Sequence, residues 1–512
     1  MELDRQVCSR ARLARDARFD GKFFIGVLTT GIYCRPVCRT RASKESNVRY
    51  FPTAAAAAEA GFRPCLRCRP ECSPGCPAWA GTQNTVSRAL RLISESGLED
   101  GGVDALADHL GVGARHLRRL FLRHLGASPS AVAQTRRLHF AKQLIDETAL
   151  PMGQVAIASG FGCVRRFNEA IRKIYERTPT QIRRLAHHTV KQRENAYVFQ
   201  LQFRPPYNWN RILEFLAARA TPGVEAVQAG RYLRSISFNG HRGFLEVCFE
   251  EDKNALRAGV QFDDPRSLIF IIERIRAMFD LNADWSVITK ALRADPVLAE
   301  SVQTEAGLRV PGCWNGFELT VRAILGQQVS VKGATTLAGR IADAFGQRFA
   351  PAPGLTHLFP TPEVLADADL TSIGLTRARA ETVRALARAV CGRRIQFEGV
   401  LDYGALRARL CEIPGIGQWT AEYVAMRALS DPDAFPAGDL HLRRKAGNCT
   451  QRELERRSQS WRPWRAYATM LLWQSVREEA PAPPVRPRGF SSAGVEGPRA
   501  TVAGGRARSP TS

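Results

Sequence analysis

The sequence predicts a multidomain chain that is mainly α-helical with α+β parts, and three observations lead to this prediction. Its 512 residues are enough for three or four domains of ordinary size. Hydrophobic residues make up 45% of the chain, which gives each domain enough material for a core. Helical patterns recur along the chain, and strand-like alternation occurs in its middle part, as at Leu245–Phe249.

The charge of the chain indicates a polyanionic partner. The formal net charge is +24 and the sequence pI is near 10.1, which is more than solubility requires. A membrane surface is the alternative partner, but no apolar run is long enough to span a bilayer and no lipidation signal occurs. Nucleic acid is therefore the expected partner.

The first functional element is a group of four cysteines near the amino end. Cys34 and Cys38 form one close pair, and Cys65 and Cys68 form the other. Two close pairs separated by a long gap are typical of tetrahedral zinc sites, in which each pair closes a tight loop around the metal. The spacing predicts a Zn²⁺ site.

Other uses of these cysteines are open. Disulfides are one, but the start of the chain, Met1–Arg10, does not resemble a secretory segment, so a reducing cytoplasm is expected. Cys72 and Cys76 follow closely and could replace one of the four as a ligand. A purely structural zinc knuckle is the plain alternative to a reactive site.

Basic residues crowd the cysteines. Zinc with four thiolates carries a net charge of about minus two, so phosphate is the group that the arginines are expected to bind. A thiolate is a nucleophile, which points to an electrophile on or near the phosphate. Together they suggest chemistry on a nucleic-acid backbone. The arginines are Arg35, Arg39, Arg41, Arg63, Arg67 and Arg69.

The segments 29–39 and 60–68 closely resemble the amino-terminal domain of the Ada adaptive-response regulators, which repair methylphosphotriesters in DNA. The resemblance spans about 16–69 and places a small α/β zinc methyl-acceptor domain at 1–80. It implies that Cys34 is both a zinc ligand and the acceptor of the methyl group, with Arg35 and Arg39 beside the DNA. Methylation would remove one negative charge and so tighten binding to DNA. The transfer would also consume the protein, because a thioether has no easy route back to a thiolate.

A linker rich in Ser, Pro and Gly follows at 70–83, and a first helix-turn-helix unit occupies 103–121. Its turn falls at Gly111. The core-facing residues of its second helix are predicted to be Leu117, Leu120 and Phe121, and the outward-facing ones Arg115, Arg118 and Arg119.

A second unit occupies 154–171 and turns at Gly160, with Arg165, Arg166 and Asn168 as the candidates for facing a DNA groove. Two such units in tandem resemble the AraC-type helix-turn-helix domain, here at 82–186. This is also the order of domains in the Ada regulators.

The second methyltransferase domain of those regulators carries a Pro-Cys-His-Arg motif, which is absent here. A different module begins near Tyr197. Its segments 311–318, 321–331 and 413–423, followed by Asp439, resemble AlkA-type 3-methyladenine DNA glycosylases over almost all of 197–479. The resemblance implies an α+β domain at 195–310 and an all-α helix-hairpin-helix glycosylase domain at 311–480.

The hairpin of this module is the turn Pro414-Gly415-Ile416-Gly417. Gly415 and Gly417 allow the backbone to approach a DNA phosphate, although a plain helix cap could have the same sequence. Asp439 matches the catalytic aspartate of the helix-hairpin-helix superfamily, where its charge would stabilise an oxocarbenium ion. The alternative role for Asp439 is that of a helix N-cap.

Three aromatic residues match positions that line the base pocket in AlkA-type enzymes: Trp419, Tyr423 and Trp473. An alkylated purine is cationic, and aromatic faces attract cations, although core packing is the ordinary role of such residues. Relatives that also cut the strand carry a lysine where this chain has Trp419, so simple hydrolysis is predicted. Gln328 replaces a leucine that wedges into DNA, and its role as a wedge is a hypothesis.

The remaining segment, 481–512, is rich in Pro, Gly, Ser and Arg and is predicted to be a disordered basic tail. The resemblances imply alkylated and promoter double-stranded DNA as partners, RNA polymerase as the contact of an activator, and a monomer in the bacterial cytoplasm. The expected function is excision of alkylated purines together with regulatory methyl transfer. Two rivals are a regulator with an inactive glycosylase half and a zinc-dependent DNA binder without chemistry.

Overall fold

A computed structural model places most of the chain, and the descriptions below concern only the residues that it describes. Cys76, most of the predicted linker and the predicted tail at 481–512 lie outside these residues. The described ranges are 4–74, 85–95, 102–185, 195–400 and 402–474.

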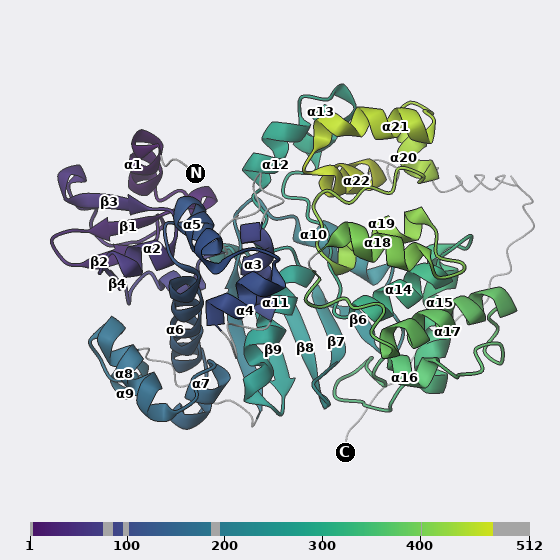
Figure 1. Ribbon diagram of the computed structural model, residues 1–512, viewed down its shortest axis with the longest axis horizontal. Coiled ribbons are helices and arrows are strands. Elements are labelled where there is room, and N and C mark those ends of the chain that lie inside the picture. The colour runs from purple at the N-terminus through teal and green to yellow at the C-terminus, as the bar shows by residue number, and fades with distance from the viewer. Residues whose placement is uncertain (1–3, 75–84, 96–101, 186–194, 401, 475–512) are drawn as a thin grey trace, which may run out of the picture.

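The amino-terminal part is a small α/β unit (Figure 1). Its four-stranded sheet has the order β3-β1-β2-β4, in which β2 and β4 are parallel and the other pairs antiparallel. Helix α2 packs on the sheet over Phe24, Tyr33 and Phe51. The elements are α1 (Arg5–Ala14), β1 (Phe24–Val27), β2 (Ile32–Cys34), β3 (Val48–Phe51), α2 (Ala54–Glu59) and β4 (Arg63–Pro64), with short 3-10 helices η1 (Ala17–Phe19), η2 (Glu45–Asn47) and η3 (Pro70–Cys72).

Seven helices follow, and they confirm both predicted helix-turn-helix units. Gly111 and Gly160 adopt positive φ angles of 68° and 75°, a conformation that glycine adopts without strain. Leu117 and Phe121 are fully buried, as their spacing on one face of a helix predicts. The helices are α3 (Thr85–Glu95), α4 (Gly102–His109), α5 (Ala114–Leu125), α6 (Pro129–Glu147), α7 (Met152–Ala158), α8 (Val164–Tyr175) and α9 (Pro179–Leu185).

The middle of the chain forms a five-stranded antiparallel sheet with the order β5-β9-β8-β7-β6. Burial alternates along β5, as expected for a strand with one face on a core. The predicted strand at Leu245–Phe249 lies within β8. The elements are β5 (Ala196–Gln202), α10 (Trp209–Ala217), β6 (Glu225–Gln228), β7 (Arg231–Phe238), β8 (His241–Glu250), η4 (Glu251–Lys253), β9 (Ala255–Phe262), η5 (Pro265–Ser267) and α11 (Leu268–Met278).

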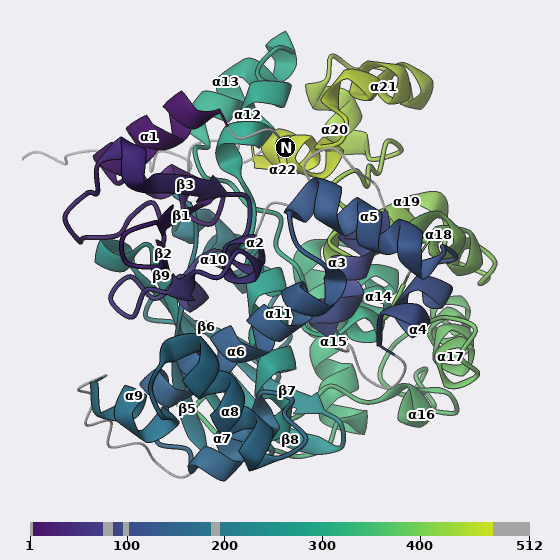
Figure 2. The same ribbon diagram turned by 60° about the vertical axis from the view of Figure 1, so that its left-hand side comes forward.

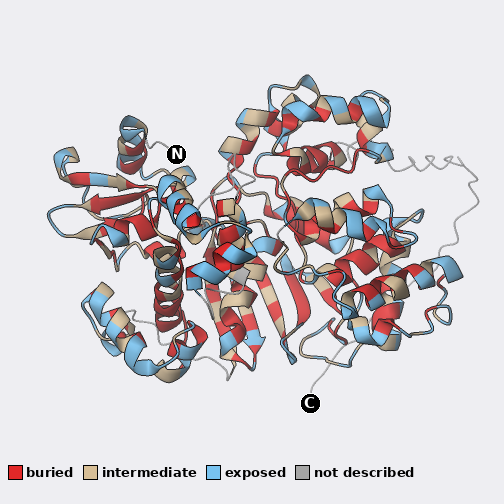
Figure 3. Cartoon of the chain, in the orientation of Figure 1, coloured by how far each residue is buried: buried red, intermediate tan, exposed pale blue. Residues whose placement is uncertain are grey.

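The carboxyl-terminal part is helical and encloses a hydrophobic core that extends to Leu472 and also includes Phe215 of α10 and Ala283 (Figure 3). Helices α18 and α19 form the predicted helix-hairpin-helix. The elements are α12 (Trp285–Leu292), α13 (Pro296–Thr304), α14 (Gly316–Leu325), α15 (Val331–Phe345), α16 (Pro362–Leu365), α17 (Arg377–Cys391), α18 (Tyr403–Cys411), α19 (Gln418–Ala428), α20 (Leu440–Lys445), α21 (Gln451–Arg457), η6 (Ser458–Trp461) and α22 (Arg465–Gln474).

The helix-turn-helix region packs against both of its neighbours. Helix α6 extends from the contact with α2 to the helices α7 and α9 (Figure 2). Phe167 and Tyr175 of α8 belong to the same hydrophobic cluster as Phe199 of β5 and Val260 of β9. The described parts therefore pack into one body.

None of the described helices combines the length and apolar character that a membrane span requires.

Candidate functional site

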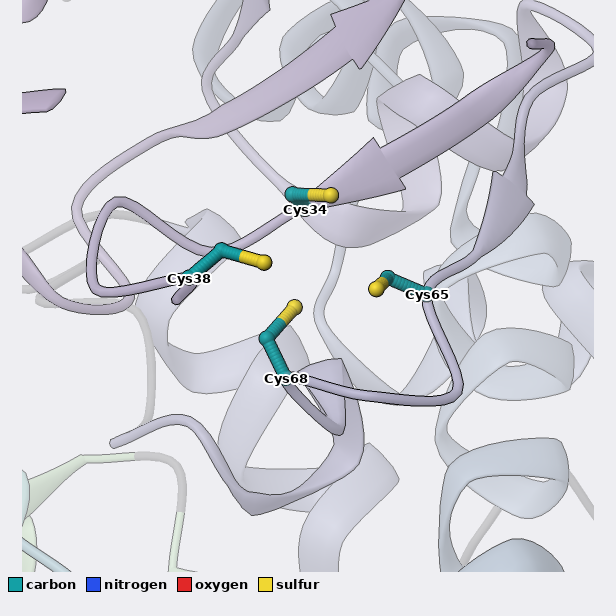
Figure 4. A group of neighbouring side chains, drawn as sticks. All are labelled: Cys34, Cys38, Cys65 and Cys68. Atoms are coloured by element: carbon teal, nitrogen blue, oxygen red, sulfur yellow. The ribbon is translucent and has the colours of Figure 1, made fainter. Parts of the chain in front are cut away.

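The four predicted cysteines converge at one edge of the small sheet (Figure 4). Cys34 ends β2 and Cys65 directly follows β4, and because these two strands are parallel, both cysteines lie at the same edge. Tight turns bring in the second member of each pair: Cys38 N–H donates to Arg35 O, and Arg69 N–H donates to Cys65 O next to Cys68.

The cluster fits a zinc ion. All four Sγ atoms lie within 4.8 Å of one another, which suits a tetrahedron with sulfurs about 2.3 Å from the metal. Cys72, which could have substituted as a ligand, is buried elsewhere and is not part of the group. Zn²⁺ is the cofactor that these four ligands are placed to hold.

The thiols influence one another strongly. Hydrogen bonding with Cys34 lowers the pKa of Cys38. A separate hydrogen bond with Cys34 lowers the pKa of Cys65 to about 6. Hydrogen bonding with Cys38 raises the pKa of Cys34. Four thiols this close cannot all lose their protons unless a cation compensates the charge, which is the role that zinc would have.

Arg35 requires a correction, because the side chain predicted to face DNA is buried. It is only 5% exposed, and its Nε donates to Asp20 Oδ1 at 2.9 Å. Its Nη1 donates to Cys68 O at 3.1 Å. A guanidinium whose donors are engaged inside the protein is not available to a phosphate, so Arg35 serves the internal structure. A single sequence does not reveal the partner Asp20, which lies fifteen residues earlier.

The other predicted DNA-facing arginines are at the surface. Arg39 is exposed next to the cysteine cluster. Arg115 and Arg118 of α5 are exposed, and so are Arg165 and Arg166 of α8, where Arg165 pairs with Glu169 at 3.1 Å. Both helices therefore present positive charge on the face opposite their buried residues.

The hairpin geometry explains its first glycine. Gly415 has a φ of 91°, and a Cβ there would lie 2.2 Å from Thr382 Oγ1, so only glycine fits. Gly417 is the N-cap residue of α19 and is exposed, with no atom within 4 Å of the position of a Cβ. The amides that begin α19 are consequently open to an anionic group.

Gln327 is a supporting residue that the sequence alone does not reveal. Its Nε2 donates to Gly415 O at 2.9 Å and to Thr420 Oγ1 at 3.1 Å. Arg379 Nη2 donates to Gln327 O at 2.7 Å. The loop after α14 is thereby fixed to the hairpin. No local pattern predicts contacts between residues so far apart in the chain.

Gln328 lies on this loop, at the surface and with a positive φ of 57°. The preceding residue, Gln327, contacts the hairpin instead. Exposed apolar residues follow, since Val329 is 38% exposed and Val331 is 44% exposed. The position suits contact with a ligand bound at the hairpin.

Asp439 and the predicted aromatic residues come together beside α19. Trp419 Nε1 donates to Asp439 Oδ2 at 3.0 Å, and Trp473 Nε1 donates to Asp439 Oδ1 at 3.4 Å. The rings of Trp419 and Tyr423 stack with centroids 5.4 Å apart and planes 8° apart. Trp473 lies 6.3 Å from Tyr423, centroid to centroid.

The alternative role of Asp439 is also present. Asp439 is the N-cap residue of α20, and its Oδ1 accepts a hydrogen bond from Leu442 N–H at 3.0 Å. One carboxylate thus caps a helix and contacts two tryptophans. The cap fixes the position of the carboxylate, and the indoles orient it.

A buried arginine supports the aromatic group from below. Arg427 Nη1 donates to Tyr423 Oη at 2.7 Å, and its other nitrogens donate to Pro311 O and Gly312 O. Burial alone raises the pKa of Tyr423, but the positive charges of Arg427 and Arg219 outweigh this effect, so the pKa lies below its usual value. The hydrogen bond from Arg427 holds the tyrosine ring in one orientation.

Family models match four consecutive parts of the chain. The metal binding domain of Ada matches residues 7–71, and a helix-turn-helix domain matches 106–185. The AlkA N-terminal domain matches 198–315. The HhH-GPD superfamily of base excision DNA repair proteins matches 321–463.

Three relatives are similar to this chain over different lengths. The "Probable bifunctional transcriptional activator/DNA repair enzyme AlkA" of Mycobacterium tuberculosis H37Rv is 41% identical over 93% of this chain and 97% of its own length. The DNA-3-methyladenine glycosylase 2 of Escherichia coli K12 is 33% identical over 54% of this chain and 96% of its own length. The bifunctional transcriptional activator/DNA repair enzyme Ada of the same organism is 40% identical over 24% of this chain and 34% of its own length.

The relative from Mycobacterium tuberculosis aligns with almost the entire chain. The four family models follow one another along the chain without overlap. The chain therefore belongs to the family of bifunctional transcriptional activator/DNA repair enzymes of the AlkA type.

Proposed function

We propose that this protein repairs alkylated DNA by two reactions, hydrolytic excision of alkylated purines and irreversible transfer of a methyl group from a DNA methylphosphotriester to Cys34. The observation that carries the proposal is the carboxylate of Asp439 held by Trp419 Nε1 at 3.0 Å beside the hairpin. The cysteine cluster supports the second reaction.

Excision begins with a nucleotide turned out of the duplex. The hairpin amides of α19 bind the backbone phosphate, and Gln328 fills the space that the extruded base leaves. Alkylation at N3 of adenine or N7 of guanine makes the base cationic, and the faces of Trp419, Tyr423 and Trp473 attract it.

Asp439 then acts on the sugar. As the glycosidic bond breaks, positive charge develops on the sugar, and the carboxylate stabilises it. The bonding pair leaves with the base, and water adds to the sugar and loses a proton. Trp419 occupies the position of the lysine that strand-cutting relatives use, so the product is an abasic site in an intact strand.

Methyl transfer uses the sulfur of Cys34. A carbon–sulfur bond forms as the carbon–oxygen bond of the methylphosphotriester breaks, and the phosphodiester leaves as an anion. Zinc, when bound, keeps the thiolates deprotonated at neutral pH. The product is a thioether, so each protein molecule reacts once. Arg39 and Arg67, which are exposed near the cysteines, bind the surrounding phosphates.

Methylation of Cys34 promotes sequence-specific DNA binding because it changes the charge of the cysteine cluster. Loss of one negative charge at the cluster reduces repulsion of DNA, and α5 and α8 then bind a promoter through Arg115, Arg118, Arg165 and Arg166. An activator of this kind contacts RNA polymerase at the promoter. We expect a monomer that works on the chromosome in the cytoplasm.

The test of excision measures the release of free bases from methylated duplex DNA. Breakage of the same DNA strands is measured before and after treatment with alkali. Free methylated purines and strands that break only in alkali are expected. A regulator with an inactive glycosylase half would bind the duplex and release no base, and this result would refute the proposed hydrolysis.

The test of methyl transfer is labelling of the protein by DNA that carries labelled methylphosphotriesters. Cys34→Ser should abolish the label. Cys163→Ser, which removes an exposed thiol at the start of α8, is the matched control and should keep it. Equal labelling of both variants would contradict the assignment of Cys34.

A further inference from the structure

The buried side chain of Arg35 connects the cysteine cluster to the glycosylase half. Its backbone N–H donates to Cys68 Sγ at 3.4 Å, and its Nη1 donates to Cys68 O. Its Nη2 contacts Asp20 within its own domain and also Gln202 Oε1, at the end of β5. One residue thus touches a metal ligand, a buried carboxylate and a side chain of another domain.

The surroundings of this contact are polar and buried. Arg204, two residues after Gln202, is 1% exposed and donates from Nε to Asp20 O at 2.8 Å. It also donates from Nη1 to Asn282 O at 2.7 Å. Asp20, which is 4% exposed, therefore joins an arginine from each side of the domain boundary. Lys22 forms a second link to Asp284.

Such a boundary is sensitive to small displacements. Buried charges are costly when they lose a partner, so Arg35 and Arg204 restrict each other to one arrangement around Asp20. Arg35 directly follows Cys34, and the turn from Arg35 O to Cys38 N–H sets its backbone. The metal ligands on both sides of Arg35 thus determine where its guanidinium lies.

We propose that Arg35 and Gln202 couple occupancy of the metal site to the docking of the glycosylase half. With metal bound, the segment from Cys34 to Cys38 is fixed, and Arg35 is presented to Asp20 and Gln202. Loss of the metal releases this segment and the contact with Gln202. The proposal depends on the metal site alone, so its failure would leave the proposed repair reactions untouched.

The coupling is reciprocal, because two linked equilibria affect each other by the same factor. If metal stabilises docking, then docking stabilises metal binding. A change at Gln202, which belongs to another domain and is no metal ligand, must then lower the affinity for zinc. Differences in affinity between closely related variants lie mostly in the rate of dissociation, so the release of zinc should become faster.

The experiment measures release of Zn²⁺ from the full-length protein to a coloured chelator. Gln202→Ala should release zinc about fivefold faster than the parent, a change that corresponds to about 1 kcal/mol. The matched control is Gln200→Ala, on the same face of β5 and two residues earlier. Gln200 lines a cavity of about 280 Å³ between α6 and α11. The Gln200→Ala protein should release zinc at the same rate as the parent.

Hydrogen exchange provides the second readout and verifies folding. Removal of zinc should raise exchange at Ala196–Gln202 in the parent and in Gln200→Ala, and much less in Gln202→Ala, where the link is already absent. Equal rates of zinc release in all three proteins would overturn the proposal. An equal acceleration in both variants would overturn it as well, since it would show a general loosening of β5.

Discussion

Trp419 Nε1 lies 3.0 Å from Asp439 Oδ2, so the residue that forms one wall of the aromatic group also orients the carboxylate beside it. Trp419 lies in α19, whereas Asp439 is the N-cap residue of α20. In the proposed mechanism, this hydrogen bond links binding of the base to stabilisation of the sugar cation.

Asp439→Asn should reduce excision by about a hundredfold or more, because the amide carries no charge to stabilise the sugar cation. Asparagine caps helices as well as aspartate does, so α20 and the thermal stability should be preserved. Single-turnover release of methylated purine measures the effect. Near-normal excision by a folded variant would show that the residue is only a cap.

Trp419→Phe retains an aromatic face but removes the indole N–H. Excision should fall about tenfold, because Asp439 loses one of the donors that orient it. Trp473→Phe should have a smaller effect, since its N–H lies 3.4 Å from the carboxylate. The control is Trp209→Phe, which removes an indole that donates to Gly230 O in the sheet region. A loss in the control equal to that in Trp419→Phe would argue against a role in orientation.

Gln328→Gly should separate duplex from single-stranded substrates. Glycine suits the positive φ of 57°, so the backbone loses nothing, while the side chain that fills the gap disappears. We expect about tenfold slower excision from duplex DNA and little change on single strands, where no base stack needs to be filled. An equal decrease on both substrates would rule out the wedge.

His139 should make the junction between the amino-terminal sheet and α6 sensitive to acid. Its Nε2 lies 2.9 Å from Tyr33 Oη, and burial lowers its pKa to about 4. The unfolded chain takes up a proton near pH 6.5, and the folded chain does so only near 4. The contribution of neutral His139 to the free energy of unfolding is therefore fully present above about pH 6.5. This contribution is lost as the pH drops towards 4, by about 3 kcal/mol at most.

His139→Gln provides the check, because it retains a hydrogen-bonding side chain without the titration. The difference in urea midpoint between the parent and the variant should change in the variant's favour between about pH 7.5 and about pH 5. The comparison is needed because burial raises the pKa of Asp280 to about 6, which acts in the opposite direction. A difference that is constant with pH would contradict the prediction.

The sequence predicted most of this molecule because its signals are local. The paired cysteines, the glycines at helix turns and the hairpin all appear within a few residues, and the structure places them as expected. Their surroundings depend on long-range packing. Nothing near Arg35 in the sequence indicates Asp20 or Gln202, and nothing near Gln327 indicates the hairpin carbonyl that it contacts. The sequence therefore assigns Arg35, which lies beside a predicted phosphate site, to DNA, whereas the buried side chain binds an internal partner.

The central claim is that one chain performs both repair reactions, and mass spectrometry after a single incubation with methylated duplex tests it most directly. The account predicts one added methyl group on the peptide that contains Cys34, together with free methylated purines and unbroken strands. A protein that keeps its original mass, in a solution that contains no released base, would contradict it.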